Sequence, residues 1–207
     1  MSEHGNSVAQ LVVRMAAMVA GYATFILSIL ITVEVICRKF FGFSFQGVDE
    51  YGGYVLAIGV SLSLSYALVM RAHTRVDVLI NPLGRRLRAG FNVLAAAMMA
   101  ALACFLCWQS VATLRETLEF DSRASTPLET PLWIPQLIWV AGFALFAVVA
   151  LSYLIRGLRL AAGGQVDALN GLLGPKTTDE ELNEALEDSQ MARLSGSVPD
   201  AHMEVKP

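Results

Sequence analysis

The sequence of 207 residues contains few charged residues, whereas the surface of a soluble protein normally carries many. Only 16% of its residues are Asp, Glu, Lys or Arg, whereas 55% are hydrophobic. An average soluble domain carries about 25% charge. Histidine and cysteine are also scarce, with three residues of each. So little charge in so apolar a chain excludes an ordinary soluble globular domain.

The scarcity of polar groups also excludes several kinds of membrane protein. The histidines are His4, His73 and His202, and none lies inside a long apolar run, so paired histidines cannot hold a haem between helices. No apolar run has a central acidic residue or arginines at every third position. Pumps, ion-coupled carriers and voltage sensors need such groups along their route. We therefore expect no catalytic residue, no metal site and no cofactor.

What the chain does have is four long runs without a charged residue. Each run reaches the roughly 17–25 residues that a helix needs to cross the hydrocarbon core of a bilayer. The runs are 15–33, 51–70, 89–114 and 130–155. We predict an all-α integral membrane protein with four transmembrane helices. The predicted helices are about Val12–Cys37, Val48–Met70, Ala89–Leu114 and Leu132–Ile155.

The ends of the chain are predicted to lie on the cytoplasmic side. The first run outlasts the apolar region of a signal peptide and follows no basic cluster, so we expect it to be retained as a helix. Eight Lys and Arg residues flank the helices on the side of the N-terminus, against four on the other side. The positive-inside rule then places both termini in the cytoplasm. The apolar residues of the loop between helices two and three indicate a short in-plane segment. These residues are Val76, Leu79, Leu83 and Leu87.

Composition divides the chain into a four-helix membrane domain, 1–160, and an acidic cytoplasmic tail, 161–207. Residues 156–207 hold nine of the 18 acidic residues but only five of the 15 basic ones. This balance argues against a nucleic-acid partner. The tail is predicted to be a linker followed by a short helix at 181–194, because Thr178 and Glu181 have the spacing of a capping box.

Two sets of residues are candidates for contact with a partner or with the membrane surface. Small residues recur at every fourth position of the second helix, where they allow close approach of another helix. They are Gly53, Ala57, Ser61 and Ser65. They could dock a partner protein or pack inside the four-helix domain, and the sequence leaves both open. Charged residues near the ends of the predicted helices are candidate interface anchors. They are Glu34, Arg38, Asp49 and Glu50 on one side, and Arg71, His73, Arg75 and Asp77 on the other.

Two thiols offer a different function. Cys104 and Cys107 have the CxxC spacing of redox proteins, which would make the chain a membrane thiol oxidoreductase. They lie in an apolar run with nothing nearby to stabilise a thiolate, so buried small side chains are the favoured interpretation. A tetraspan assembly protein of unrelated lineage is a third alternative.

A series of short motifs resembles one family. In order, they are Arg38, the aromatic hairpin 40–45, Asp49-Glu50, Tyr54, Arg71, His73-x-Arg75-Val76-Asp77 and Pro127-x(6)-Ile134-Pro135. Over about residues 10–160 the chain resembles the DctQ-type small membrane subunit of tripartite ATP-independent periplasmic (TRAP) transporters. Thr74 departs from the aliphatic residue usual in that family, and the tail from about Gly163 is longer than such subunits need.

The resemblance implies a role in a secondary transporter of the bacterial inner membrane that carries organic acids and is usually driven by sodium. In such systems a periplasmic binding protein delivers the substrate, and a large membrane subunit holds the transport and ion sites. The small subunit has no known site of its own and braces the large one. We therefore expect a non-enzymatic scaffold subunit whose partners are the large subunit, the binding protein and the bilayer, and whose substrate is determined by those partners.

Overall fold

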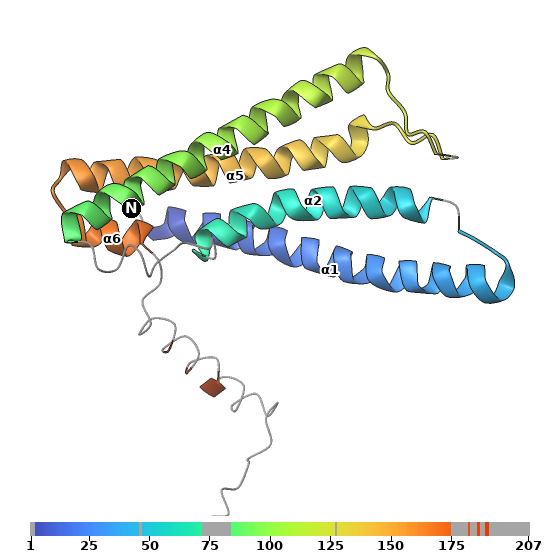
Figure 1. Ribbon diagram of the computed structural model, residues 1–207, viewed down its shortest axis with the longest axis horizontal. Helices are drawn as coiled ribbons and strands as arrows, with labels where there is room; N and C mark the ends of the chain where they lie inside the picture. The colour runs from blue at the N-terminus through green and yellow to red at the C-terminus, as the bar shows by residue number, and fades with distance from the viewer. Residues whose placement is uncertain are drawn as a thin grey trace, which may run out of the picture.

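The computed structural model describes residues 3–45, 47–71, 84–126 and 128–174, together with Leu182, Leu186, Ser189 and Gln190. The elements within these ranges are α1 (Glu3–Phe41), α2 (Val48–Val69), α4 (Arg85–Glu119), α5 (Trp133–Ala162) and α6 (Val166–Leu173), and no strand occurs among them (Figure 1). Helices α1, α2, α4 and α5 are long and apolar enough to cross a membrane. The predicted all-α class with four membrane helices is confirmed.

Three of the long helices extend further than the uncharged runs predicted. Helix α1 begins at Glu3 instead of Val12, and α5 ends at Ala162 instead of Ile155. Helix α4 has 35 residues, about 52 Å of helix, whereas the hydrocarbon core is about 30 Å thick. A charged residue ends the apolar stretch but not the helix, because arginine is a good helix former and its long side chain reaches the headgroups.

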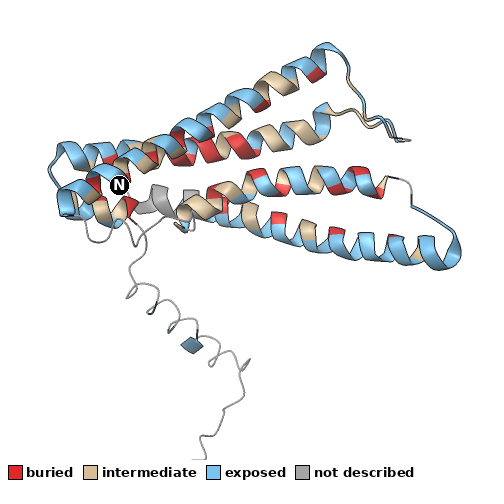
Figure 2. Cartoon of the chain, in the orientation of Figure 1, coloured by how far each residue is buried: buried red, intermediate tan, exposed pale blue. Residues whose placement is uncertain are grey.

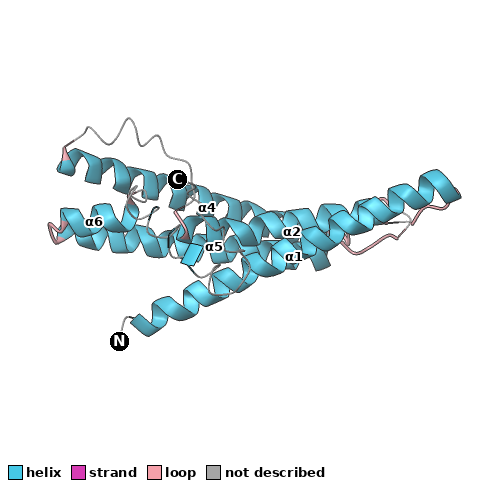
Figure 3. Ribbon diagram, turned by 90° about the horizontal axis from the view of Figure 1, so that it is seen from below, coloured by secondary structure: helices cyan, strands magenta, loops and turns pink. Residues whose placement is uncertain are grey.

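The four long helices form two hairpins that meet along one seam. Helix α1 packs on α2, α4 packs on α5, and the contact between α2 and α5 joins the two pairs. Among the described helices, α1 packs extensively only against α2. In the turned view α1 crosses its neighbours obliquely, and its N-terminal turns project away from them (Figure 3). The chain is therefore an open arrangement of helices, with large apolar surfaces left for lipid or another protein.

The seams between helices repeat every seven residues. Within 11–41, the part of α1 whose side chains the structure describes, the buried residues are Val13, Ala20, Leu27 and Glu34. A similar series on α4 consists mainly of small residues: Ala89, Ala96, Ala103, Ser110 and Thr117. A strict seven-residue repeat keeps one stripe of a helix facing its neighbour when the two supercoil. The repeat of small residues in 89–117 could have been read from the sequence as the face of α4 that packs against its neighbours. The search for runs without charged residues did not detect it.

Burial is concentrated where α2, α4 and α5 come together (Figure 2). Phe146 is the largest side chain of this core, and it is packed among Ala100, Ala103 and Ala150, with Leu64 of α2 at the edge. Small residues on α4 and α5 let the helix backbones approach closely, which is the main source of helix association in lipid. Helix α1 contributes little to this core, so packing within the chain stabilises it less than the other three long helices.

The region after α5 differs from the prediction of a linker. The chain turns at Gly163–Gly164, where Gly164 has a φ of 67°, and then forms α6. Leu169 and Leu173 of α6 are buried against the first turns of α4 and the last turns of α5. The expected tail helix, 181–194, is described only at Leu182, Leu186, Ser189 and Gln190, which are helical. Of the apolar positions assigned to an in-plane segment, Leu87 lies in α4, and Val76, Leu79 and Leu83 lie outside the described residues.

Candidate functional site

The predicted ridge of small residues on α2 divides into two halves. Ser61 and Ser65 are completely buried inside the chain, whereas Gly53 and Ala57 are exposed. The Ser61 hydroxyl donates to the carbonyl oxygen of Ile58 at 2.9 Å, which satisfies its polar group within its own helix. The inner half of the ridge thus packs against this chain, and only the outer half is accessible to another molecule.

The partner of Ser61 is a glycine on α5. A Cβ atom built on Gly142 would lie 2.8 Å from the Cβ of Ser61 and 3.0 Å from its carbonyl carbon. Real side chains essentially never approach so closely, so this position requires glycine. The pair brings the backbones of α2 and α5 close together at the junction between the two hairpins.

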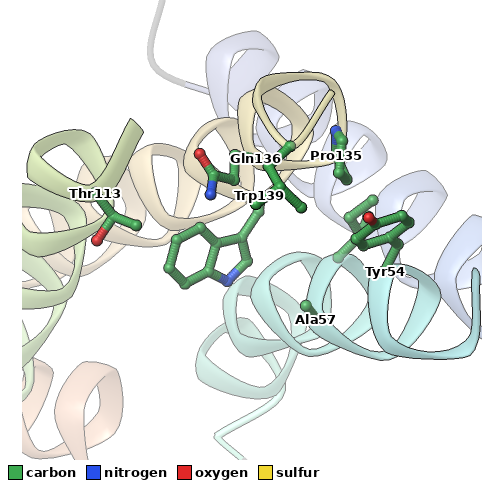
Figure 4. Close-up of a pocket in the computed structure, with 8 residues that line it drawn as sticks. Tyr54, Ala57, Thr113, Pro135, Gln136 and Trp139 are labelled. Atoms are coloured by element: carbon green, nitrogen blue, oxygen red, sulfur yellow. The ribbon is translucent and has the colours of Figure 1, made fainter. Parts of the chain in front are cut away.

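Ala57, in the exposed half of the ridge, lines an apolar groove between α2, α4 and α5. The groove has a volume of about 240 Å³. Its lining residues are Tyr54, Ala57 and Ile58 of α2, Thr113 of α4, and Leu132, Pro135, Gln136 and Trp139 at the start of α5 (Figure 4). The buried Oε1 atom of Gln136 has no hydrogen-bond partner among the described residues. Most of the lining residues are apolar, so the groove can receive an apolar group, and Gln136 offers that group one hydrogen-bond acceptor.

The end of the molecule that carries the turns 42–47 and 120–132 is called the loop end below. There Glu34, near the end of α1, is buried, and its Oε1 accepts a hydrogen bond from Ser44 at 2.9 Å. Arg38, four residues further along, lies 3.7 Å from the same oxygen and is mostly exposed. The structure thus contains the ion pair that the i,i+4 spacing suggested, and the hydroxyl of Ser44 ties it to the turn after α1.

Glu50 is the centre of a second cluster at the loop end. It is buried in the first turn of α2, and its carboxylate accepts hydrogen bonds from the hydroxyl groups of Tyr54 at 2.8 Å and of Thr126. The Thr130 hydroxyl donates to it as well. Asp49, the neighbouring candidate anchor, is exposed. Glu50 is therefore committed to groups of its own chain, and Asp49 is the acidic residue of this turn that faces outward.

Further contacts hold the loop between α4 and α5 in place, so that Thr126 and Thr130 reach Glu50. Leu128 fits against Gly47, whose φ is 91°, and a Cβ on Gly47 would lie 3.1 Å from Cγ of Leu128. Within the loop, the backbones of Arg123 and Pro131 form an isolated antiparallel β-bridge. The amide of Leu132 donates to the carbonyl of Ser122 at 3.2 Å. We refer to six residues of this junction as the loop-end clasp. They are Gly47, Glu50, Tyr54, Thr126, Leu128 and Thr130.

At the opposite end only one of the four predicted anchors can be placed. Arg71 follows α2 with a φ of 55°, and it is half-buried. His73, Arg75 and Asp77 lie outside the described residues. The two thiols of the CxxC sequence are free, Cys104 exposed and Cys107 half-buried on α4. Within the described residues, no group of three or more His, Cys, Asp or Glu side chains could hold a metal ion.

A comparison with known protein families matches residues 27–160 to the model for the DctQ component of tripartite ATP-independent periplasmic transporters. The chain belongs to the DctQ family. No curated protein and no solved structure matches it. The match spans all of α2, α4 and the membrane part of α5, and it includes the loop-end clasp. Members of the DctQ family are components of transporters, as the resemblance of the motifs implied.

Helix α6 lies beyond the region matched to the DctQ family. Its side chains bind α4: the Nη1 atom of Arg85 lies 3.0 and 3.1 Å from the two carboxylate oxygens of Asp167, and the amides of Asn92 and Asn170 are joined at 3.0 Å. Leu173 fills a notch at Gly157, where a Cβ would lie 3.3 Å from its Cγ. Sequence reasoning missed this site, because its two halves are about 80 residues apart. The signal in the sequence was a set of apolar residues, spaced as on one face of a helix, directly after Gly163-Gly164. They are Val166, Leu169, Leu172 and Leu173.

Proposed function

We propose that this DctQ chain is the non-catalytic scaffold subunit of a sodium-driven TRAP transporter for organic acids in a bacterial inner membrane. Its termini lie in the cytoplasm and its loop end in the periplasm. It holds the static part of the large membrane subunit, while that subunit carries substrate and ions. The periplasmic binding protein docks over the loop end.

The observation that carries this proposal is the distribution of polar groups in the DctQ chain. The buried hydroxyl groups of Ser61 and Ser110 bond to carbonyls of their own helices. Glu34 and Glu50 are buried at the loop end and bonded to Ser44 and Thr126. A transport route needs polar groups that are available to a solute along the membrane interior. These buried polar groups are instead occupied by the chain itself. The hydroxyl group of Ser65 has no partner among the described residues, but its side chain is completely buried and so is not accessible to a solute.

The second supporting observation is the apolar surface that the open arrangement leaves uncovered. Along α1 large side chains such as Tyr22, Phe25 and Ile26 are all more than 60% exposed. On α2, the exposed half of the small-residue ridge adjoins the apolar groove at Ala57. Small residues beside a groove favour close packing of another transmembrane helix. We infer that a helix of the large subunit lies along Gly53 and Ala57.

The experiment is co-purification of the large subunit with variants of this chain, followed by uptake in proteoliposomes. Ala57→Leu places bulk in the groove and should weaken recovery of the large subunit. Ser63→Leu is the control, because Ser63 is exposed on another face of the same helix. Equal recovery with both variants would contradict docking at Ala57. A large subunit that is stable and fully active without this chain would contradict the scaffold function itself.

A further inference from the structure

A cavity at the α6 end of the molecule has no role in the proposed function. Its volume is about 380 Å³, and it lies between the first residues of α4 and the turn that leads into α6. The side chains of Arg85 and Arg86 form one wall. Residues 164–168 form the other wall, and they include the first turn of α6. The N-terminus of a helix carries a partial positive charge, which favours an anion. The one carboxylate of this wall, Asp167, is paired with Arg85.

The surroundings of the cavity are strongly basic. The described start of α4 and end of α5, together with α6, carry several arginines and, among the described residues, a single acidic residue, Asp167. The arginines include Arg85, Arg86, Arg88 and Arg159. The charge of these four arginines exceeds what Asp167 can neutralise, so an anionic ligand is electrostatically complementary to the cavity.

The two arginines of the cavity retain hydrogen-bonding capacity. A guanidinium group has five N–H donors in a fixed geometry. Arg85 uses its Nη1 atom for Asp167, which holds the side chain in place and leaves its other nitrogens available. Arg86 is exposed, and it has no ion-pair partner within the part of the chain that the structure describes. Arginine binds phosphate through two parallel N–H bonds, so this pair is suited to a phosphate group.

The depth of the cavity identifies the source of that phosphate. Arg85 lies four residues before the uncharged run that begins at Ala89, about 6 Å along the helix axis. The headgroup layer extends about 5–7 Å beyond the hydrocarbon core on each side of a bilayer. The arginines therefore lie at the depth of lipid phosphates. Basic pockets between membrane helices on the cytoplasmic side bind the headgroups of anionic lipids.

We propose that the cavity binds the phosphate of an anionic phospholipid between Arg85 and Arg86 of α4 and the first turn of α6. The bound headgroup bridges α4 and α6, adding a second link beside the ion pair of Arg85 with Asp167. The site is formed by this chain alone, and only its placement on the cytoplasmic side rests on the proposed function. The family match ends at residue 160, so it does not include the α6 wall of the site.

The test is native mass spectrometry of the full-length chain, with any permease that co-purifies, from bilayers of phosphatidylglycerol and phosphatidylethanolamine. Wild type should retain phosphatidylglycerol preferentially, and Arg86→Gln should lower that preference by about fivefold, the effect of one basic residue at a membrane surface. Arg115→Gln is the matched control, because Arg115 is an exposed arginine near the other end of the same helix. This control should leave the preference unchanged.

Three results would overturn the proposal. One is an equal loss of preference in Arg86→Gln and Arg115→Gln, which would indicate non-specific attraction. Another is stabilisation against heat by inorganic phosphate alone to the same extent as by phosphatidylglycerol, which would identify free phosphate as the ligand. The last is a preference that appears only after removal of residues 175–207, which would identify the acidic tail as the occupant. Loss of the lipid without loss of the permease separates this site from the scaffold function.

Discussion

Ser61 of α2 lies so close to Gly142 of α5 that any side chain at position 142 would overlap it. The pair lies on the α2–α5 contact that joins the two hairpins, and α1 packs extensively only against α2. The orientation of α1 and α2 relative to α4 and α5 therefore depends in part on this close contact between helices. The scaffold function that we propose requires rigidity at this joint, because a flexible joint could not hold a partner in place.

The first prediction concerns this joint. Gly142→Ala should lower the free energy of unfolding by about 1–3 kcal/mol, the usual cost of overpacking a close contact. Thermal unfolding in detergent measures the change. Gly53→Ala is the control, since a Cβ there meets nothing within 4 Å, and alanine is the better helix former. A Gly142→Ala protein as stable as Gly53→Ala would show that the helices can separate at this point without cost.

The second prediction concerns the loop-end clasp. Glu50→Ala removes the acceptor of the Thr126 and Tyr54 hydroxyl groups. Hydrogen bonds to a charged group contribute about 1.5–3 kcal/mol, so amide exchange in residues 120–132 should accelerate about tenfold or more. Hydrogen–deuterium exchange measures this directly. Asp49→Ala should leave the loop unchanged, because Asp49 is exposed. Similar exchange in both variants would mean that Leu128 alone holds the loop.

The third prediction separates α6 from the acidic tail. Truncation after Gly174 keeps α6, whereas truncation after Ala162 removes it and uncovers the surface that Leu169 and Leu173 bury. Full burial of a leucine contributes about 1.5–3 kcal/mol, so the shorter chain should lose about 3–6 kcal/mol of stability. The longer truncated chain should unfold like the full-length protein. Resistance to unfolding and to protease, compared across the three lengths, checks both expectations.

A point variant keeps this test interpretable if the shorter chain fails to accumulate. Leu173→Ala removes the side chain that fills the notch at Gly157. It should cost about 2–5 kcal/mol, the range for leucine-to-alanine changes in a core. Leu172→Ala is the comparison, because Leu172 is only partly buried beside the same cluster. If Leu172→Ala were the more harmful of the two, α6 would not be docked through Leu173.

The sequence predicts the spans of this protein better than their ends or their contacts. Uncharged runs locate the lipid-exposed parts, because charge is costly in hydrocarbon. They do not locate helix ends, since Arg85 and Arg159 continue their helices outside that layer. The ion pair of Glu34 and Arg38 could be predicted because it is local. The bond from Thr126 to Glu50 could not, because Thr126 is 76 residues away and reaches Glu50 only once α4 and α5 have paired.

The same distinction explains the two outcomes on α2. Spacing of four residues establishes that Gly53, Ala57, Ser61 and Ser65 share a face, and it applies equally to a face that packs within the chain and to one that binds a partner. Only the position of Gly142 in the folded chain shows that Ser61 packs against α5 and not against a partner protein. Helix α6 was missed for a related reason. Its apolar spacing is short, and its burial depends on Gly157 and on the start of α4.

The last prediction discriminates the transporter subunit from a thiol oxidoreductase. Cys104 and Cys107 are both free thiols one turn apart on α4. A scaffold subunit has no use for their redox chemistry, so the double variant Cys104→Ala/Cys107→Ala should support uptake at the wild-type rate. Reconstituted proteoliposomes measure uptake, and alkylation followed by mass spectrometry measures the oxidation state of the thiols. Quinone-dependent oxidation of these thiols in wild type, together with loss of activity in the variant, would favour the oxidoreductase over the scaffold function for this member of the DctQ family.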